Sequence, residues 1–431
     1  MAAPLPGIRI AAKGLARRHG RNPGADHGGL RGFGIGARRC ATASVALCWL
    51  HVDIQPLRPL RGGPASALPS PPDAAAEVAR LARGRGALLD VDEAFPEAEL
   101  IALAETGLLR APLPLALGGA DLGRGGEGAA ALAEVLTRIG AGSLPLGRLY
   151  EGHVNALGLI LAYGNPAQQA RAAEDTRAGR LFGVWNTDDR ADPLRIEEGT
   201  EGPVLRGRKV LASGAGWVER PLVTTATPEG PQMLVPALAR GERADLSGWR
   251  AQGMRASATG AVALDGLPAG PAERIGAPGD YHREPLFSGG AWRFLAVQTG
   301  GAAELFDLLC RHLRELGRDG DPHQRARVGE AAVALETARL WVGQAARRLA
   351  DGEMEPEATV AYVNLARRAV EQAALDILAL AQRSVGLAAF IRPHPLERVA
   401  RDLATYLRQP APDRALDLAA AHLLGREGWP W

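Results

Sequence analysis

The chain has 431 residues, of which 46% are apolar and 23% charged, and its formal net charge is +2. At roughly 100–200 residues per domain, this length suggests two or three domains. The composition is that of an ordinary globular protein and excludes a wholly disordered or fibrous one. The small net charge gives no reason to expect nucleic acid or a membrane surface as a partner, so we predict neither.

The charge is divided unevenly along the chain. Residues 1–70 carry ten of the 50 basic groups but only two of the 48 acidic groups. This segment is rich in Gly, Arg and Pro, and it has no helical or strand period. Such a segment buries too little apolar surface to offset its ordering entropy. We predict a disordered basic extension over residues 1–70, with a targeting or interaction tail as the alternative.

The three cysteines, Cys40, Cys48 and Cys310, are too few and too scattered for a disulfide framework or a paired metal motif. The sequence also has no zinc spacing, Walker loop, GxSxG elbow or Rossmann GxGxxG motif. We therefore predict a cytoplasmic protein without a metal site.

Residues 72–180 are predicted to form an N-terminal helical domain. Apolar residues recur there with a helical period, and Gly107, Gly164 and Gly179 follow three of the segments, where helices commonly end. The expected helices cover residues 75–83, 96–106, 127–139, 152–163 and 166–178.

Short runs rich in Val, Leu and Thr replace this pattern over residues 181–288. Gly, Pro and Asp punctuate them at spacings typical of strands joined by turns. We predict a central antiparallel β domain with strands within residues 181–187, 205–215, 221–227, 232–238 and 260–266.

Residues 289–431 return to a helical pattern. From Val328 to Leu349 apolar residues alternate spacings of three and four, which gives the narrow seam of an antiparallel bundle. We predict a C-terminal four-helix bundle, with shorter helices at 396–407 and 412–424 near its end. The predicted fold is therefore α+β and multidomain, with the β domain between two helical ones.

Five segments carry more specific patterns. They are TGLLRAPLPLALGGADLG (106–123), AYGNPAQQARAAEDTRAGRLFGVWNTDD (162–189), RGRKVLASGA (206–215), GMRASATGAVALDGLPAG (253–270) and LERVARDLATYL (396–407). In this order, the chain resembles the acyl-CoA dehydrogenase superfamily of flavoproteins from about residue 75 to 425. The resemblance implies FAD, or alternatively FMN, held between the β domain and the bundle. It also implies a homodimer or homotetramer.

The resemblance implies cofactor contacts for eight residues. Trp185, Asn186 and Thr187 match the strand that lies along the flavin ring, where a Trp face can cover the ring and a Thr can bond its pyrimidine edge. Ser213 matches a hydroxyl near the reactive nitrogen of the flavin. The last four match positions that contact cofactor phosphates, adenosine or a neighbour's cofactor: Arg314, Gln324, Gln382 and Gly386. Ordinary places in a strand, a turn or a solvated helix are the alternative for all eight.

The resemblance fails at the base that dehydrogenases of this family use. They abstract a proton with a glutamate, but Pro410 occupies the expected position, and proline cannot take a proton. Asp413 and Glu304 are the candidate substitutes. The loop after Thr187 also lacks the Gly-Ser that helps hold coenzyme A in the family, so binding of CoA is in doubt.

A sister branch, the flavin-dependent monooxygenases, also lacks the glutamate; it takes reduced flavin and uses histidines near it. The chain keeps Arg401 and Asp402 of that branch's C-terminal signature but has Tyr406 and Gln409 in place of its histidines. His153 lies close to where the branch carries an N-terminal histidine, which makes it a candidate catalytic residue. A structural histidine is the alternative.

Three hypotheses follow for function. The first is a flavin-dependent oxidoreductase of acyl-CoA dehydrogenase type that acts on an acyl thioester or a related small acyl substrate. The second is a monooxygenase fed with reduced flavin. The third is a flavin-binding relative without catalysis.

Overall fold

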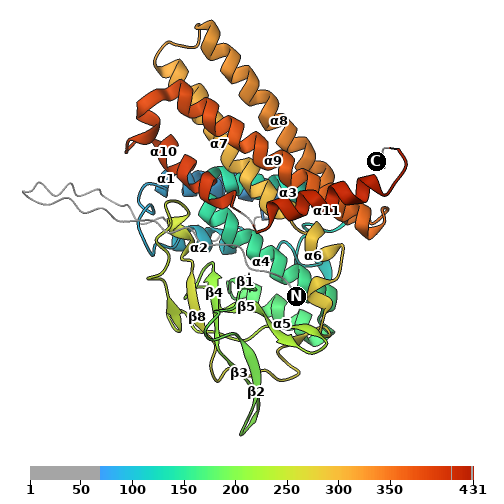
Figure 1. The fold of residues 1–431 in the computed structure, drawn as a ribbon. Coiled ribbons are helices and arrows are strands. Elements are labelled where there is room, and N and C mark those ends of the chain that lie inside the picture. Colours follow the sequence, from blue (N-terminus) through green and yellow to red (C-terminus); the bar gives the residue numbers. More distant parts are fainter. Residues whose placement is uncertain (1–67, 409, 429–430) are drawn as a thin grey trace, which may run out of the picture. The chain divides into compact units, whose positions relative to one another are not determined.

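The computed structural model describes residues 68–408, 410–428 and 431 (Figure 1). All but the last three residues of the predicted basic extension, residues 1–70, therefore lie outside the described residues. The described elements belong to one compact unit.

The N-terminal part is helical, as predicted. Side chains cap several of the helices: Ser70 accepts a hydrogen bond from the Asp73 amide, and Asn165 and Gln168 form a reciprocal capping box. The helices are α1 (Pro71–Arg85), α2 (Glu97–Glu105), α3 (Gly125–Gly142), α4 (Leu144–Tyr163) and α5 (Pro166–Arg177).

Helix α4 begins at Leu144, well before the predicted start at residue 152. Ser143 caps it by accepting from the Leu146 amide, and Pro145 is tolerated because it lies in the first turn. Gly147 reads as a helix breaker in the sequence. In the fold a Cβ there would lie 2.4 Å from Cγ1 of Val297 on α7 (Trp292–Glu315), so the glycine permits close packing of the two helices.

The central part is a set of short strands. They are β1 (Phe182–Trp185), β2 (Arg195–Gly199), β3 (Gly202–Arg206), β4 (Arg208–Ala212), β5 (Arg220–Thr227), β6 (Gly230–Leu234), β7 (Ala244–Asp245), β8 (Gly260–Ala263) and β9 (Arg274–Ile275). Within the described residues they form sheets with the orders β1-β5-β6-β9, β2-β3 and β4-β8-β7. The sequence did not predict β2, β7 or β9, which are short or polar, and its segment 205–215 covers β4 but only the last two residues of β3.

One pair departs from the predicted antiparallel arrangement. β1 runs parallel to β5, with Trp185 opposite Val223, whereas the other pairs are antiparallel. The chain leaves β1, forms β2 to β4, and re-enters the sheet in the original direction. A long connection of this kind is what a parallel pair requires.

The C-terminal part is the predicted helical bundle. It contains α6 (Leu286–Gly289), α7, α8 (Pro322–Asp351), α9 (Pro356–Val385), α10 (Pro395–Tyr406) and α11 (Pro412–Leu424). The seam of α8 is buried at Ala331, Ala338, Val342 and Ala345. The segment Pro356–Phe390 is long and apolar enough to span a membrane, but α9 packs against α7, α8 and α11. The predicted fold class is confirmed.

Helix α4 connects all three parts. It contacts β1 of the β domain and α7 and α10 of the bundle, and Figure 1 shows it between the sheets and the long helices. Side chains on α4 are therefore placed to act at this junction.

Candidate functional site

Three polar side chains share one face of α4. Arg148, Glu151 and Asn155 are spaced by three and four residues, which places them one above another on a helix. Arg148 forms an ion pair with Glu151, whose side chain is only 1% exposed, while that of Arg148 is 31% exposed. Asn155 donates a hydrogen bond to the other oxygen of Glu151. A buried carboxylate is thus held from both sides along its own helix.

Side chains from the other two parts of the fold complete this group. Tyr406 of α10 donates to Oε1 of Glu151 over 3.4 Å, and Nη1 of Arg293 on α7 donates to Oδ1 of Asn155 over 3.0 Å. From the β domain, the Ser213 hydroxyl accepts from Nε of Arg148 over 3.3 Å. We call these six residues the α4 cluster: Arg148, Glu151, Asn155, Ser213, Arg293 and Tyr406.

Burial fixes the charge states in the α4 cluster. Burial raises the pKa of Tyr406 well above its usual value, and the charge of Glu151 adds to this effect, so the phenol stays neutral. Burial lowers the pKa of Arg293 to about 10, which leaves its guanidinium charged at neutral pH. Burial also lowers the pKa of Arg148, but its interactions with Glu151 and Tyr406 together outweigh that effect, and the net shift is upward.

The segment predicted to lie along a flavin meets this cluster at Ser213. Trp185 is 2% exposed, and its indole N–H donates to the Ser213 carbonyl over 2.9 Å, so it fixes the position of Ser213 from within the core. Asn186 and Thr187 are exposed where β1 ends. Their carbonyls accept from Nζ of Lys209 and from the Val210 amide. The structure therefore brings Ser213, Asn186 and Thr187 to one edge of the β domain.

His153 faces the opposite side of α4. It lies two residues after Glu151, and residues at that spacing point in different directions on a helix. Its Nε2 donates to the Leu109 carbonyl over 2.7 Å, and its Nδ1 accepts from the Phe182 amide over 3.1 Å. Burial lowers its pKa to about 4. Both ring nitrogens are engaged by backbone inside the core, and this geometry favours a structural role.

The other four predicted cofactor residues lie at one end of the bundle, where α7 ends, α8 begins and α9 ends. Arg314 is exposed and donates to the Cys310 carbonyl of its own helix. Gln324 is buried, and its Oε1 has no hydrogen-bond partner within the described residues. Gln382 lies in the last turn of α9, and Gly386 follows with a φ of +75° that favours glycine. This grouping is compatible with a shared ligand, but it is separate from the α4 cluster.

The two carboxylates that the sequence offers as substitute bases lie outside the α4 cluster. Glu304 is 4% exposed and accepts from Nε and Nη2 of Arg83 over 2.9 and 2.7 Å. Asp413 is exposed in the first turn of α11. Pro410 is exposed and its carbonyl accepts from Arg367. Glu304 therefore joins α7 to α1 by an ion pair.

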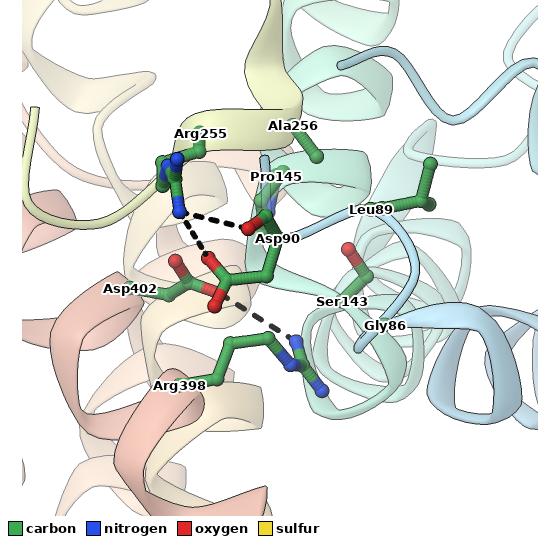
Figure 2. A pocket seen from close by; sticks show the side chains of 9 residues that line it. All are labelled: Gly86, Leu89, Asp90, Ser143, Pro145, Arg255, Ala256, Arg398 and Asp402. Atoms are coloured by element: carbon green, nitrogen blue, oxygen red, sulfur yellow. Dashed lines mark hydrogen bonds and ion pairs between the residues drawn. The ribbon is translucent and has the colours of Figure 1, made fainter. Parts of the chain in front are cut away.

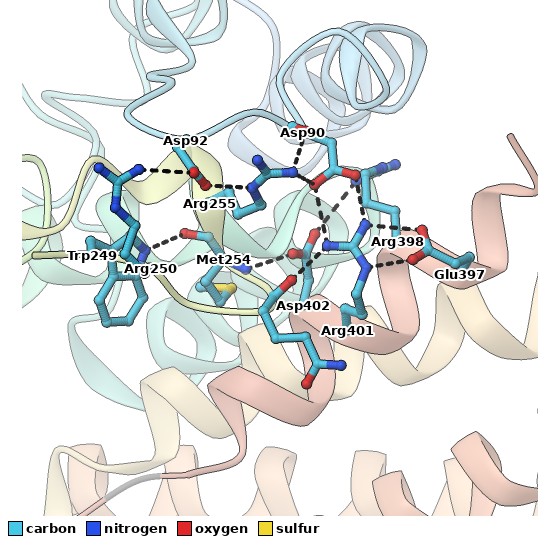
Figure 3. Close-up of polar contacts among 11 residues, drawn as sticks. Asp90, Asp92, Trp249, Arg250, Met254, Arg255, Glu397, Arg398, Arg401 and Asp402 are labelled. Carbon is cyan, nitrogen blue, oxygen red and sulfur yellow. Dashed lines mark hydrogen bonds and ion pairs between the residues drawn. The ribbon is translucent and has the colours of Figure 1, made fainter. Parts of the chain in front are cut away.

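A second polar network joins the same three parts of the fold (Figure 3). Nη2 of Arg401 on α10 donates to Asp90, in the loop after α1, over 2.6 Å, and the same guanidinium also contacts Glu397. Arg255, in the loop before β8, lies 3.5 Å from Asp90 and 2.8 Å from Asp92. We call these five residues the Asp90 clasp. Arg401 belongs to the segment LERVARDLATYL (396–407), and in the structure its side chain fixes α10 against two other segments.

Asp402 extends this network inward. Its Oδ1 accepts from the Met254 amide over 2.6 Å, and burial raises its pKa to about 6. The cavity beside it, drawn in Figure 2, has a volume of about 10 Å³. That is close to the space of one water molecule, and it is far too small for a flavin. The clasp region is therefore structural, whereas the α4 cluster has a partly exposed cation, Arg148, that a ligand could meet.

The sequence prediction missed Arg148, Glu151 and Asn155. The predicted helix began at residue 152, so the first two residues fell outside it, and His153 was the only member of that stretch to be singled out. The spacing of three and four residues between these polar side chains, on an otherwise apolar segment, could have indicated one polar face of a longer helix. Pro145 and Gly147 concealed it because both read as breakers.

Two family models match the chain. The N-terminal domain of acyl-CoA dehydrogenase covers residues 74–180, and the C-terminal domain covers residues 285–407. The chain belongs to the acyl-CoA dehydrogenase superfamily. The predicted family is therefore confirmed, and with it a flavoprotein of this superfamily.

The proteins that are similar to this chain differ in the reactions that their names describe. The amino sugar nitrososynthase RubN8 of Streptomyces rubradiris is 26% identical over 376 residues, which cover 80% of this chain and 87% of RubN8. TdsC of Paenibacillus sp. A11-2, solved with FMN and indole, has a TM-score of 0.71 at 20% identity and covers 84% of this chain and 98% of TdsC. A glutaryl-coenzyme A dehydrogenase in complex with glutaryl-CoA has a TM-score of 0.70 at 22% identity, covering 82% and 95%. At these identities the structures show a shared fold.

Proposed function

We propose that this protein is a flavin-dependent monooxygenase that takes reduced flavin and oxygenates a small molecule. The observation that carries the proposal is that the carboxylate of Glu151 is buried and fully engaged by neighbouring side chains. It is the acidic member of the α4 cluster, and Arg148, Asn155 and Tyr406 all contact it. A carboxylate held in this way is a poor general base, because proton abstraction needs a carboxylate within reach of the substrate and free to accept.

The relatives also support a monooxygenase. TdsC has been solved as a dibenzothiophene monooxygenase, and RubN8 is an amino sugar nitrososynthase, so neither name refers to an acyl thioester. TdsC holds FMN, and we propose FMN as the cofactor of this protein, with FAD as the alternative. The acyl-CoA dehydrogenase reaction, which the sequence placed first, would need a free carboxylate at the junction, whereas Glu151 is held by three side chains and Glu304 is paired with Arg83.

The residues around Ser213 fit a flavin ring. Arg148 and Ser213 offer N–H and O–H donors at the junction, and Asn186 and Thr187 add exposed polar groups at the end of β1. These are the groups that bond ring nitrogens and carbonyls. When bound, the flavin would supply the chemistry that activates oxygen. The protein residues would hold the ring through Ser213 and Thr187, and Arg148 would orient the reacting groups beside it.

We also propose a homodimer or homotetramer, in which Arg314, Gln324, Gln382 and Gly386 face a cofactor at a subunit contact. Apolar side chains are exposed at that end of the bundle, among them Leu316, Leu387 and Phe390. Sedimentation analysis of the purified protein tests this arrangement, and a monomer at micromolar concentration would contradict it.

The decisive experiment measures the fate of oxygen. The protein is loaded with FMN or FAD and supplied with a flavin reductase, NADH and labelled oxygen, with indole and dibenzothiophene as first probes. We expect labelled oxygen in a product or flavin-dependent oxygen uptake above that of the reductase alone. In parallel, the oxidised flavoprotein is mixed anaerobically with glutaryl-CoA and other acyl-CoA thioesters. Bleaching of the flavin there would refute the monooxygenase proposal in favour of the dehydrogenase.

A further inference from the structure

The α4 cluster holds more positive than negative charge. Arg148 and Arg293 both belong to it, and Glu151 is its one acidic member. Nε of Arg293 is buried and has no hydrogen-bond partner in the described part of the chain. The same part of the chain provides no ion pair for this guanidinium, which interacts with the charge of Glu151 and lies 5.3 Å from the centre of the Trp292 ring.

An excess cation in such a place is unfavourable by itself. Burial penalises a charge unless an opposite charge compensates it, and for Arg293 the penalty lowers the pKa to about 10. The guanidinium nevertheless remains charged at neutral pH. An anion that enters the junction would offset this penalty, and a second cation would increase it.

The partly exposed side chains of the cluster include a guanidinium and a hydroxyl, which can donate hydrogen bonds. Glu151 is 1% exposed and lies beneath Arg148, whose side chain is 31% exposed beside the half-buried Ser213. A guanidinium has N–H donors and no acceptor, and its planar fork matches a planar anion with two acceptors. A ligand arriving at this point therefore meets a positive charge and hydrogen-bond donors.

We propose that the α4 cluster is an anion-recognition site, in which Arg148 contacts a planar anionic group while Glu151 and Tyr406 position its guanidinium. This inference rests on the proposed function. The anionic group has two possible sources there: the deprotonated pyrimidine ring of reduced flavin, or a carboxylate of the substrate. A substrate that presents a cationic amine to Arg148 is disfavoured by charge.

The test isolates the charge of Arg148 in a background without the buried carboxylate. Glu151→Gln keeps an oxygen that can accept from Arg148, and the double variant Arg148→Met/Glu151→Gln then removes the guanidinium. Comparison of these two variants avoids leaving Glu151 buried and unpaired. Arg138→Met is the matched control, because Arg138 pairs with Glu134 on the surface of α3, with both side chains more than 40% exposed.

Two measurements distinguish the sources of the anion. The first is the midpoint potential of bound FMN, which gives the ratio of affinities for reduced and oxidised flavin. We expect Glu151→Gln to raise this ratio and the double variant to lower it at least tenfold from that level, which equals about 30 mV for two electrons. The second is binding of benzoate to the oxidised FMN-loaded protein, followed through the flavin absorbance.

Each result has a defined meaning. A potential that depends on Arg148 supports the reduced flavin as the anion, whereas benzoate affinity that falls tenfold without guanidinium supports a substrate carboxylate. If FMN binds and neither quantity responds to Arg148, the anion site is refuted and the proposed function stands. Failure of the unmodified protein to bind FMN or FAD would instead refute the proposed function.

Discussion

Replacement of Arg401 by methionine should weaken the attachment of α10 to the rest of the fold. Arg401 is 16% exposed and donates to Asp90, to Glu397 and to the Gln252 carbonyl. Asp90 is itself only 7% exposed. Methionine fills a similar volume but makes none of these hydrogen bonds, so the carboxylate of Asp90 loses its main partner.

The loss of stability depends on the interactions that Asp90 keeps after Arg401 is replaced. Removing one member of a buried ion pair costs about 3–5 kcal/mol, because the other charge stays behind. Two features reduce that figure here: Arg255 still lies 3.5 Å from Asp90, and water can reach the partly exposed site. We therefore expect Arg401→Met to lower the free energy of unfolding by about 2–3 kcal/mol.

Urea denaturation followed by tryptophan fluorescence and by circular dichroism measures this loss, and coincidence of the two curves checks that one transition is observed. The matched control is Arg339→Met, which breaks an exposed pair with Glu336 on α8. Such a pair is worth about 0–1 kcal/mol, so the control should differ little from the unmodified protein. An equal loss in both variants would refute the clasp as a special contact.

Three further predictions test other parts of the structure. Burial lowers the pKa of His153 from about 6.5 to about 4, so between these pH values only the unfolded chain binds the proton, and stability should fall by up to about 3 kcal/mol as the pH drops through this range. His153→Gln should remove this dependence yet retain FMN; an unchanged pH profile would contradict it. Gly253→Ala should lower the denaturation midpoint, because its Cβ would lie 2.2 Å from the Arg401 carbonyl oxygen, and Gly248→Ala, with open space, should not. Lys209→Met should weaken FMN binding in a fluorescence titration, because Lys209 holds the end of β1. A variant that melts at a lower temperature but binds FMN with unchanged affinity would refute that role.

The sequence predicted the helices well where apolar periodicity was long and uninterrupted. The α8 seam from Val328 to Leu349 specified both the helix and its buried face, since a regular stripe has one way to be buried. The parallel pairing of β1 with β5 could not be predicted, because each strand looks the same in either direction. What decides it is the path of the intervening chain.

The site was predicted only in part, because the predicted start of α4 was wrong. Ser213 was predicted through the resemblance, and the structure joins it to Arg148, whereas Tyr406, which contacts Glu151, was noted only because it replaces a histidine of the monooxygenase branch. Arg148 itself was missed because α4 was predicted to start too late. A glycine that permits close helix contact and a glycine that ends a helix look alike in sequence, and only the position of Val297 on α7 distinguishes them.

The use of basic residues also gains a physical meaning. Only two of the 50 basic residues are lysine. In the structure, Arg401 spans acceptors from separate segments with its planar fork, which a lysine cannot reproduce. Lys209 is fully buried and needs only a compact ammonium, 2.6 Å from Asp188 and 3.0 Å from the Asn186 carbonyl. Because the segment it holds adjoins Ser213, the one described lysine supports the edge at which a flavin is proposed to bind, while arginines hold the parts of the fold around it.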